Sequence, residues 1–229
     1  MPTAKAGQGP VGYLVNHRDG LAGVQGIGYD YVLGADGLYV QSESAQLTAR
    51  VLAAPCEVRG LASVTEKVEL AKGPIPARLF EVGLRWFHDD PHTERFFAVR
   101  WDGRAYRLVV PEQEGTATRL KYTPPPGVVA EFHSHGSSRA FFSKTDDGDE
   151  QGFRIYGVVG RLDDPEPELR LRVGVYGHFA PADWPQVFDG PHPGLRLMGK
   201  EPDSTDEIAK EVIECLTALI TRSCWTTPG

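Results

Sequence analysis

The spacing of apolar residues changes from helical to strand-like between residues 77 and 110. Over 77–87 apolar side chains recur every three to four positions, which predicts an amphipathic helix. Apolar and other residues then alternate over 97–101 and again over 106–110, and Asp102-Gly103 between them is a strong hairpin signal. The pattern therefore predicts a helix followed by a β-hairpin.

Short apolar runs broken by glycine and aspartate fill residues 11–70 and predict a small β-rich region. The prolines of Gly73-Pro74-Ile75-Pro76 mark its end, because proline disfavours continuation of any preceding element. Later apolar runs predict three more strands, and a capping box at Ser204–Glu207 opens a C-terminal amphipathic helix. The further predicted elements are strands over 128–135, 154–162 and 169–179 and the helix over 204–222.

These elements indicate an α+β fold, in which helices pack on the faces of a mixed, strongly curved sheet. We divide the chain into a β-rich N-terminal region (1–73), a central domain (74–198) and a C-terminal helix with its tail (199–229).

The composition excludes several classes of protein. Among 229 residues, 24 Lys and Arg stand against 31 Asp and Glu, for a net charge of −7, and no basic cluster is present. Nucleic acid is therefore not expected as a partner. The chain has no run of 18 apolar residues, and its first ten residues hold one lysine with no apolar segment after it. We therefore expect no membrane span, no signal peptide and a cytoplasmic protein. The three cysteines lack a metal-binding spacing and are interpreted as buried or idle thiols.

One short segment of the sequence contains residues that could form a catalytic site. His133 and His135 lie two apart on a predicted strand, so both imidazoles project from one face and can bind one ion. Asp146, at the start of a predicted helix, can add a carboxylate oxygen, and Ser143 lies three residues before it. Two histidines, a carboxylate and a water make a catalytic zinc site. The alternatives are a chance pair of half-exposed imidazoles and a plain helix-capping pattern for Ser143 and Asp146.

The spacing His-x-His, seven residues, Ser, two residues, Asp resembles the signature of the JAMM (MPN-type) zinc metalloproteases, which include deubiquitinases. The resemblance covers about residues 74–198 and implies a JAMM-like fold for them. It also implies that His133, His135 and Asp146 bind Zn²⁺ and that Ser143 stabilises the oxyanion of the tetrahedral intermediate. The family uses a glutamate as general base.

We favour Glu94 as this base, because it follows the predicted helix and opens the next strand. Glu81 is the alternative, since Glu81-Val82-Gly83 is similar to a family phrase, although its glycine comes one residue early. Glu131 shares the strand face of His133, and we interpret it as a solvated carboxylate or one that holds a ligand histidine. The acidic run 146–150 is interpreted as a helix start and not as a calcium loop.

Three further phrases, at 30–33, 58–62 and 133–143, resemble the PRTRC system protein A family. Its bacterial gene clusters also encode activating-enzyme-like, conjugating-enzyme-like and ubiquitin-like proteins. The resemblance implies a deubiquitinase-like peptidase or isopeptidase that cleaves after the C-terminal tail of a ubiquitin-like protein. Two alternatives remain open: a weakly active or inactive interaction scaffold, and a zinc hydrolase of small molecules or short peptides.

Overall fold

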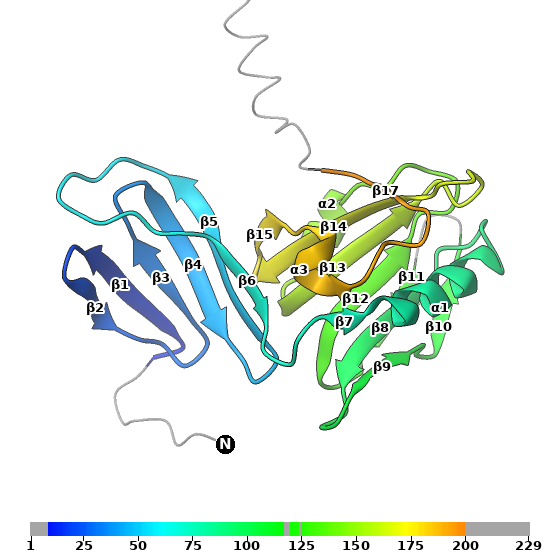
Figure 1. The fold of residues 1–229 in the computed structure, drawn as a ribbon, viewed down its shortest axis with the longest axis horizontal. Helices are drawn as coiled ribbons and strands as arrows, with labels where there is room; N and C mark the ends of the chain where they lie inside the picture. The colour runs from blue at the N-terminus through cyan, green and yellow to red at the C-terminus, as the bar shows by residue number, and fades with distance from the viewer. Residues whose placement is uncertain (1–8, 117–119, 124, 200–229) are drawn as a thin grey trace, which may run out of the picture. The chain divides into compact units, whose positions relative to one another are not determined.

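The computed structural model describes residues 9–116, 120–123 and 125–199, and Met1–Met198 form one compact unit. Two large β-sheets lie within this unit, coloured blue to cyan and green to yellow in Figure 1. Three helices accompany them in the described part of the chain. The protein therefore combines α and β structure and is rich in sheet, which agrees with the predicted α+β class.

The first sheet has six strands in the order β2-β1-β3-β4-β5-β6. Its members are β1 (Val11–His17), β2 (Gly20–Val24), β3 (Tyr29–Leu33), β4 (Gly37–Glu43), β5 (Leu47–Pro55) and β6 (Lys67–Leu70). Only β1 and β3 run parallel; the other neighbours are antiparallel. The glycine-punctuated apolar runs of the N-terminal region thus form one sheet of short strands.

The second sheet runs in the order β15-β14-β13-β12-β8-β9, and β17 pairs with β14. Its members are β8 (Phe96–Trp101), β9 (Tyr106–Val109), β12 (Val128–Ser134), β13 (Phe153–Gly160), β14 (Glu168–Val175), β15 (His178–Pro181) and β17 (Arg196–Leu197). The central pair β12 and β13 is parallel, so the sheet is mixed. A separate pair, β10 (Gln113–Gly115) and β11 (Leu120–Tyr122), lies beyond β9 in the sequence.

The predicted strand over 169–179 is wrong in one respect, because it is two strands. Tyr176 and Gly177 both have positive φ, 50° and 86°, and they turn the chain between β14 and β15. Two consecutive left-handed residues match the twist of a tight hairpin. The aromatic and apolar residues on both sides concealed this turn, for which Gly177 was the available signal.

The helix α1 (Ala77–His88) begins where the two prolines of the Gly73–Pro76 segment end. β7 (Ile75–Pro76) pairs with β16 (Phe188–Asp189), which follows α3 (Trp184–Val187). This pairing brings Asp189 to the start of α1, where its Oδ1 accepts a hydrogen bond of 2.7 Å from the amide of Ala77. A residue distant in sequence therefore caps the helix.

The apolar face of α1 buries Phe80 and Phe87 against the second sheet. Phe80 makes edge contacts with Phe97 and Phe132, and Gly83 leaves room for the Phe97 ring, which a side chain at that position would strike. The glycine of the Glu81-Val82-Gly83 phrase therefore has a packing role inside α1.

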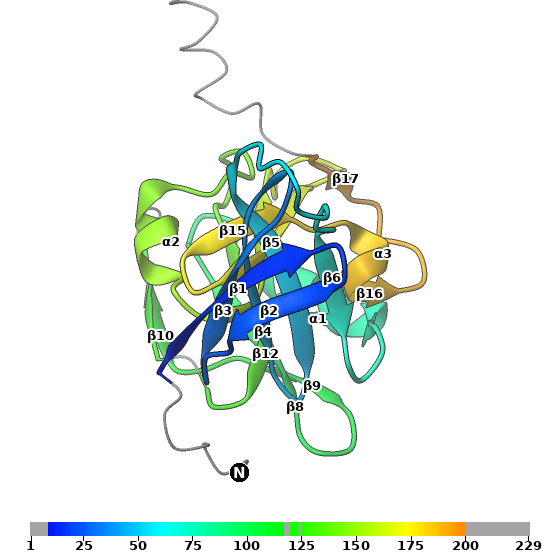
Figure 2. The same cartoon turned by 90° about the vertical axis from the view of Figure 1, so that its left-hand side faces the viewer.

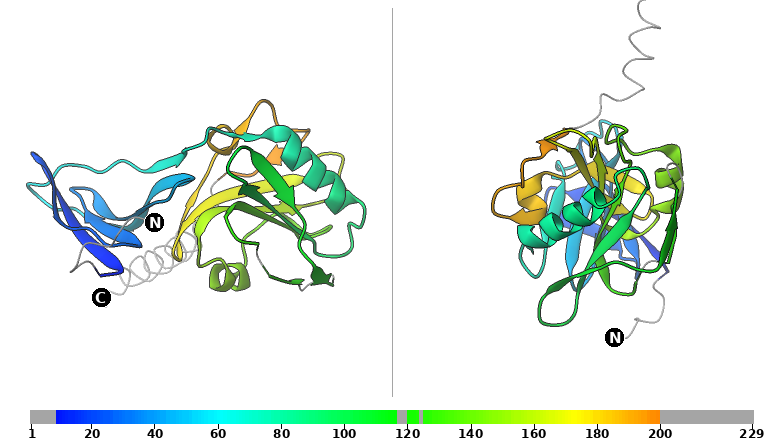
Figure 3. Two further views of the ribbon diagram at one scale, coloured as in Figure 1. Left: turned by 90° about the horizontal axis from the view of Figure 1, so that it is seen from below. Right: turned by 90° about the vertical axis from the view of Figure 1, so that its right-hand side faces the viewer.

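The second sheet separates α1 from the short helix α2 (Lys144–Asp149), which lies on its opposite face (Figure 3). Side chains alternate along β12, so Phe132 enters the core under α1 whereas His133 faces the α2 side. One strand thus contributes both to the core and to the face that carries the chemistry.

The first sheet also contributes to the main core through Val40, Ala49 and Val51, which are fully buried. At the same junction the hydroxyl of Tyr31 lies 3.3 Å from Nε2 of His178 on β15. Figure 2 shows the strands of the first sheet in front, with β15 behind them. The N-terminal strands are therefore packed on the second sheet.

Three sequence-based expectations concern other parts of the chain. The C-terminal helix over 204–222, with Cys215 and Cys224, lies outside the described residues. Cys56 is an exposed free thiol. None of the helices in the described residues has the length and apolar character needed to cross a bilayer.

Candidate metal centre

The end of β12 brings two imidazoles together. His133 is the penultimate residue of the strand, and His135 follows it, held by a hydrogen bond of 2.8 Å from its amide to the carbonyl of Val159. The Nε2 atoms of the two histidines lie 3.1 Å apart. Because both side chains are at least 86% buried, this arrangement is a built feature of the interior and not a chance surface pair.

The first turn of α2 adds a carboxylate to the pair. Ser143 caps the helix: its hydroxyl accepts from the amide of Asp146, and Oδ2 of Asp146 accepts from the amide of Ser143 at 2.6 Å. This capping box fixes the Asp146 side chain and leaves Oδ1 directed at the histidines, 3.4 Å from Nε2 of His133. The capping and ligand interpretations of the Ser-x-x-Asp pattern are therefore compatible.

The three side chains fit a single metal ion. One ligand atom from each of His133, His135 and Asp146 lies within 4.8 Å of the others. In a tetrahedral site with bonds of about 2.0–2.1 Å, ligand atoms are about 3.3 Å apart. The two Nε2 atoms, 3.1 Å apart, and the pair Nε2 of His133 and Oδ1 of Asp146, 3.4 Å apart, lie near that value. Nε2 of His135 lies 4.0 Å from Oδ2 of Asp146, so the carboxylate must approach His135 slightly to bind the same ion.

A cavity of about 350 Å³ opens beside these ligand atoms. It is lined by residues of the loop before β8, of β11, of the end of β12 and of α2: Glu94, Leu120, Lys121, Tyr122, His133, His135, Ser143, Thr145, Asp146, Asp149 and Glu150. The candidate site therefore has room for a substrate group next to a metal.

The electrostatics of the cavity keep the imidazoles neutral. Burial lowers the pKa of His133 to about 4, although the charge of Asp146 opposes this shift, and burial also lowers the pKa of His135. Neutral imidazole is the form that binds metal ions. Both histidines are thus ready to act as ligands near neutral pH.

Glu94 and Glu81, the two candidates for the general base, lie in different places. Glu94 precedes β8 and lines the cavity; burial raises the pKa of its carboxyl, and the nearby negative charge of Asp146 raises it further. Glu81 lies in the middle of α1, on the other face of the sheet, and does not line the cavity. The structure brings Glu94 together with the three potential ligands and keeps Glu81 apart.

Glu131 is neither solvated nor in contact with a ligand histidine. It is buried, and one of its carboxylate oxygens forms an ion pair with Arg154 on the neighbouring strand β13. Burial raises the pKa of its carboxyl, and Arg154 opposes that shift.

The carboxylate that lies beside a candidate ligand histidine is that of Glu150, at the end of the acidic run 146–150. Its Oε1 lies 3.8 Å from Nδ1 of His133, and Oε2 accepts two hydrogen bonds from Arg172. Burial raises the pKa of Glu150, and the charge and hydrogen bonds of Arg172 oppose this shift and favour the carboxylate form. The sequence offered one unused signal for this role: Glu150 follows Asp146 by four residues, a spacing that brings two side chains to the same side of a helix.

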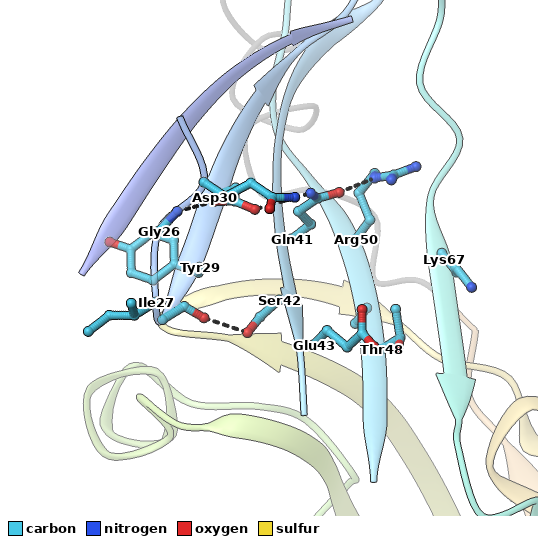
Figure 4. Close-up of a pocket in the computed structure, with 13 residues that line it drawn as sticks. Gly26, Ile27, Tyr29, Asp30, Gln41, Ser42, Glu43, Thr48, Arg50 and Lys67 are labelled. Atoms are coloured by element: carbon cyan, nitrogen blue, oxygen red, sulfur yellow. Dashed lines mark hydrogen bonds between the residues drawn. The ribbon is translucent and has the colours of Figure 1, made fainter. Parts of the chain in front are cut away.

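A second cavity, of about 430 Å³, lies on the first sheet (Figure 4). Asp30, Gln41 and Arg50 cross three adjacent strands there as a ladder: Gln41 donates to Asp30 at 3.3 Å and accepts from Arg50 at 2.9 Å. These side chains satisfy one another's hydrogen bonds, as expected for neighbours on a sheet face. The cavity beside His133 is therefore the stronger candidate for chemistry.

Comparison with protein-family models and with curated proteins gives no match to this chain. The functional assignment therefore depends on the residues themselves and on the spacing that resembles the JAMM signature.

Proposed function

We propose that this protein is a JAMM-type zinc metalloprotease that cleaves the peptide or isopeptide bond after the C-terminal tail of a ubiquitin-like protein. The observation that carries the proposal is the convergence of His133, His135 and Asp146 on one point beside Glu94. Two imidazoles, one carboxylate and an open position are the donor set of a hydrolytic zinc centre. The fold assignment to the JAMM family is part of this proposal.

His133, His135 and Asp146 would hold the metal. Bound Zn²⁺ would make an attacking water more acidic and would polarise the scissile carbonyl. The same three donors also suit non-haem Fe(II). The nearby carboxyl of Glu94 favours hydrolysis, because a general base is what a hydrolytic site needs in addition to its metal.

The roles of the other side chains follow from their places in the cavity. Glu94 accepts a proton from the attacking water and passes it to the leaving amine. The hydroxyl of Ser143 accepts a hydrogen bond from the amide of Asp146. A serine hydroxyl that accepts one hydrogen bond can still donate another through its own O–H, and Ser143 donates this hydrogen bond to the oxyanion.

An extended substrate tail suits the wall of this cavity. Leu120, Lys121 and Tyr122 of β11 line it, and among the described strands β11 pairs with β10 alone. The outer edge of such a strand can bind an extended peptide through backbone hydrogen bonds. The tail of a ubiquitin-like protein has this extended form, and activating- and conjugating-enzyme-like proteins of the same gene cluster would supply the conjugates in the cytoplasm.

The test compares two substrates that carry the same tail: an intact ubiquitin-like protein fused to a reporter, and a free peptide. We expect both to be cleaved by the zinc-loaded protein, and the intact fusion with a kcat/KM at least about tenfold higher, or about 1.4 kcal/mol of additional transition-state stabilisation. Equal rates would favour a general peptidase. Tight zinc binding without cleavage of either substrate would favour a scaffold, and cleavage of short dipeptides alone would favour a small-molecule hydrolase.

A further inference from the structure

Arg172 holds Glu150 in a fixed position behind the metal ligands. Its Nε and Nη2 donate to Oε2 of Glu150 at 2.9 Å and 2.6 Å, and its Nη1 donates to Asp147 at 2.6 Å. The guanidinium carbon lies 3.8 Å from the ring centre of Phe142 and 3.7 Å from that of Phe179. Enclosed between two rings and hydrogen-bonded to two carboxylates, Arg172 has little freedom to move.

This arrangement leaves the other oxygen of Glu150 facing His133. Nε2 of His133 points towards His135 and Asp146, so Nε2 is the ligand atom and Nδ1 is the far nitrogen of the ring. A neutral imidazole that binds a metal through Nε2 carries its proton on Nδ1. Oε1 of Glu150 lies 3.8 Å from that nitrogen, and an approach of about 0.9 Å gives an ordinary hydrogen bond.

The need for an acceptor at this place is strong because water has little access. The side chains of His133 and Glu150 are only 14% and 8% exposed. A buried N–H without a partner destabilises a structure by about 1–3 kcal/mol. Metal-binding histidines therefore usually donate their second nitrogen to a carboxylate or carbonyl, which fixes the ring and raises its basicity.

We infer that Glu150, held by Arg172, is a positioning residue that accepts the Nδ1 proton of His133 and thereby sets the affinity and geometry of the metal site. The inference rests on the proposed metal function and deepens it. Arg172 acts on two ligands at once: it orients His133 through Glu150, and through Asp147 it fixes the helix turn that carries Asp146.

The chain offers a matched control in Glu131. It is as buried as Glu150, at 7% exposure for each residue, and it also pairs with an arginine, Arg154. It lies on the same strand face as His133 but makes its ion pair to β13 and does not line the cavity. Glu131→Gln therefore reports the general cost of removing a buried, paired carboxylate.

The experiment measures the affinity of the full chain for Zn²⁺ by competition with a chromophoric chelator, so it needs no substrate. We expect Glu150→Gln to weaken zinc binding about 10- to 100-fold. With a glutamine, the amide oxygen is needed by Arg172, so the amide nitrogen faces the Nδ1 proton. Arg172→Lys, which loses the paired hydrogen bonds, should weaken binding in the same direction, and Glu131→Gln should change it less than about threefold.

Two further readouts separate positioning from folding. Visible absorption of the Co²⁺-loaded protein should change in intensity in Glu150→Gln and stay unchanged in Glu131→Gln. In ¹⁵N-histidine NMR of the zinc-loaded wild type, the Nδ1 proton of His133 should exchange slowly with water, and this readout decides the matter if Glu150→Gln does not fold. Equal zinc affinity in Glu150→Gln and Glu131→Gln, or a rapidly exchanging Nδ1 proton, would overturn this inference alone. A wild type that binds no Zn²⁺ would overturn the proposed function and this inference together.

Discussion

Replacement of Glu94 by glutamine is the change that separates metal binding from catalysis. Glutamine keeps the shape of the side chain and removes its ability to accept a proton. The carboxyl of Glu94 is partly buried and lies close enough to Asp146 for that negative charge to raise its pKa further. A neutral glutamine avoids both the cost of burying a charge and the repulsion from Asp146. Glu94→Gln should therefore fold with an unchanged or slightly higher melting temperature and should still bind one zinc.

The expected loss is confined to the chemical step. A positioned general base contributes about 10²- to 10⁴-fold to a rate, which is about 2.7–5.4 kcal/mol of activation free energy. The assay is cleavage of the intact ubiquitin-like fusion at saturating substrate, with zinc content measured on the same samples. Glu81→Gln is the control, because Glu81 lies within α1 and away from the cavity. An active Glu94→Gln protein beside an inactive Glu81→Gln protein would refute the assignment of the base.

Three further predictions concern pH, the helix cap and the core. Burial lowers the pKa of His133 to about 4 and also lowers that of His135, so these two side chains bind fewer protons in the folded protein than in the unfolded chain between about pH 6.5 and 4. Their contribution to the stability of the metal-free protein should therefore be lost as the pH is lowered through that window, so in urea titrations the wild type should lose more stability there than the double variant His133→Ala, His135→Ala. Zinc affinity at pH 6.0 should stay within about threefold of its value at pH 7.5, where ordinary imidazoles would lose about tenfold. Ser143→Ala should lower kcat by about 10² and the free energy of unfolding by about 1 kcal/mol, whereas Ser143→Thr should retain the cap; a Ser143→Ala protein of full activity would exclude the oxyanion role. Phe80→Ala should destabilise the protein by about 3–5 kcal/mol in urea unfolding, since Phe80 is fully buried against Phe97 and Phe132, and a loss below about 1 kcal/mol would contradict this packing.

Periodicity predicted the elements whose faces differ in polarity. The helix expected over 77–87 is α1 (Ala77–His88), and the hairpin around Asp102-Gly103 is β8 and β9. The residues of β14 are buried on both faces of the sheet, so the pattern of apolar residues along it was less informative about where the strand ends. The turn at Tyr176 and Gly177 was therefore missed. Local patterns also carry no signal for pairings over long sequence distances, such as the cap of α1 by Asp189.

The candidate ligands were predictable because their spacing is local. His133 and His135 share a strand end, and Asp146 follows at the next helix start, so one short segment holds all three. The residues behind them were not predictable in the same way. Glu150 was available from its spacing to Asp146, but Glu131 was the glutamate for which contact with a ligand histidine was considered, as an alternative to a solvated carboxylate. In the structure Arg172 binds Glu150 and turns its other oxygen towards His133.

Metal content tests the central claim most directly. Purified protein, dialysed against metal-free buffer and analysed for zinc and iron together, should hold one zinc per chain, and the double variant His133→Ala, His135→Ala should hold less than about a tenth of that while remaining folded. Full zinc content in the double variant would place the metal elsewhere, and iron in place of zinc in the wild type would contradict the hydrolytic account.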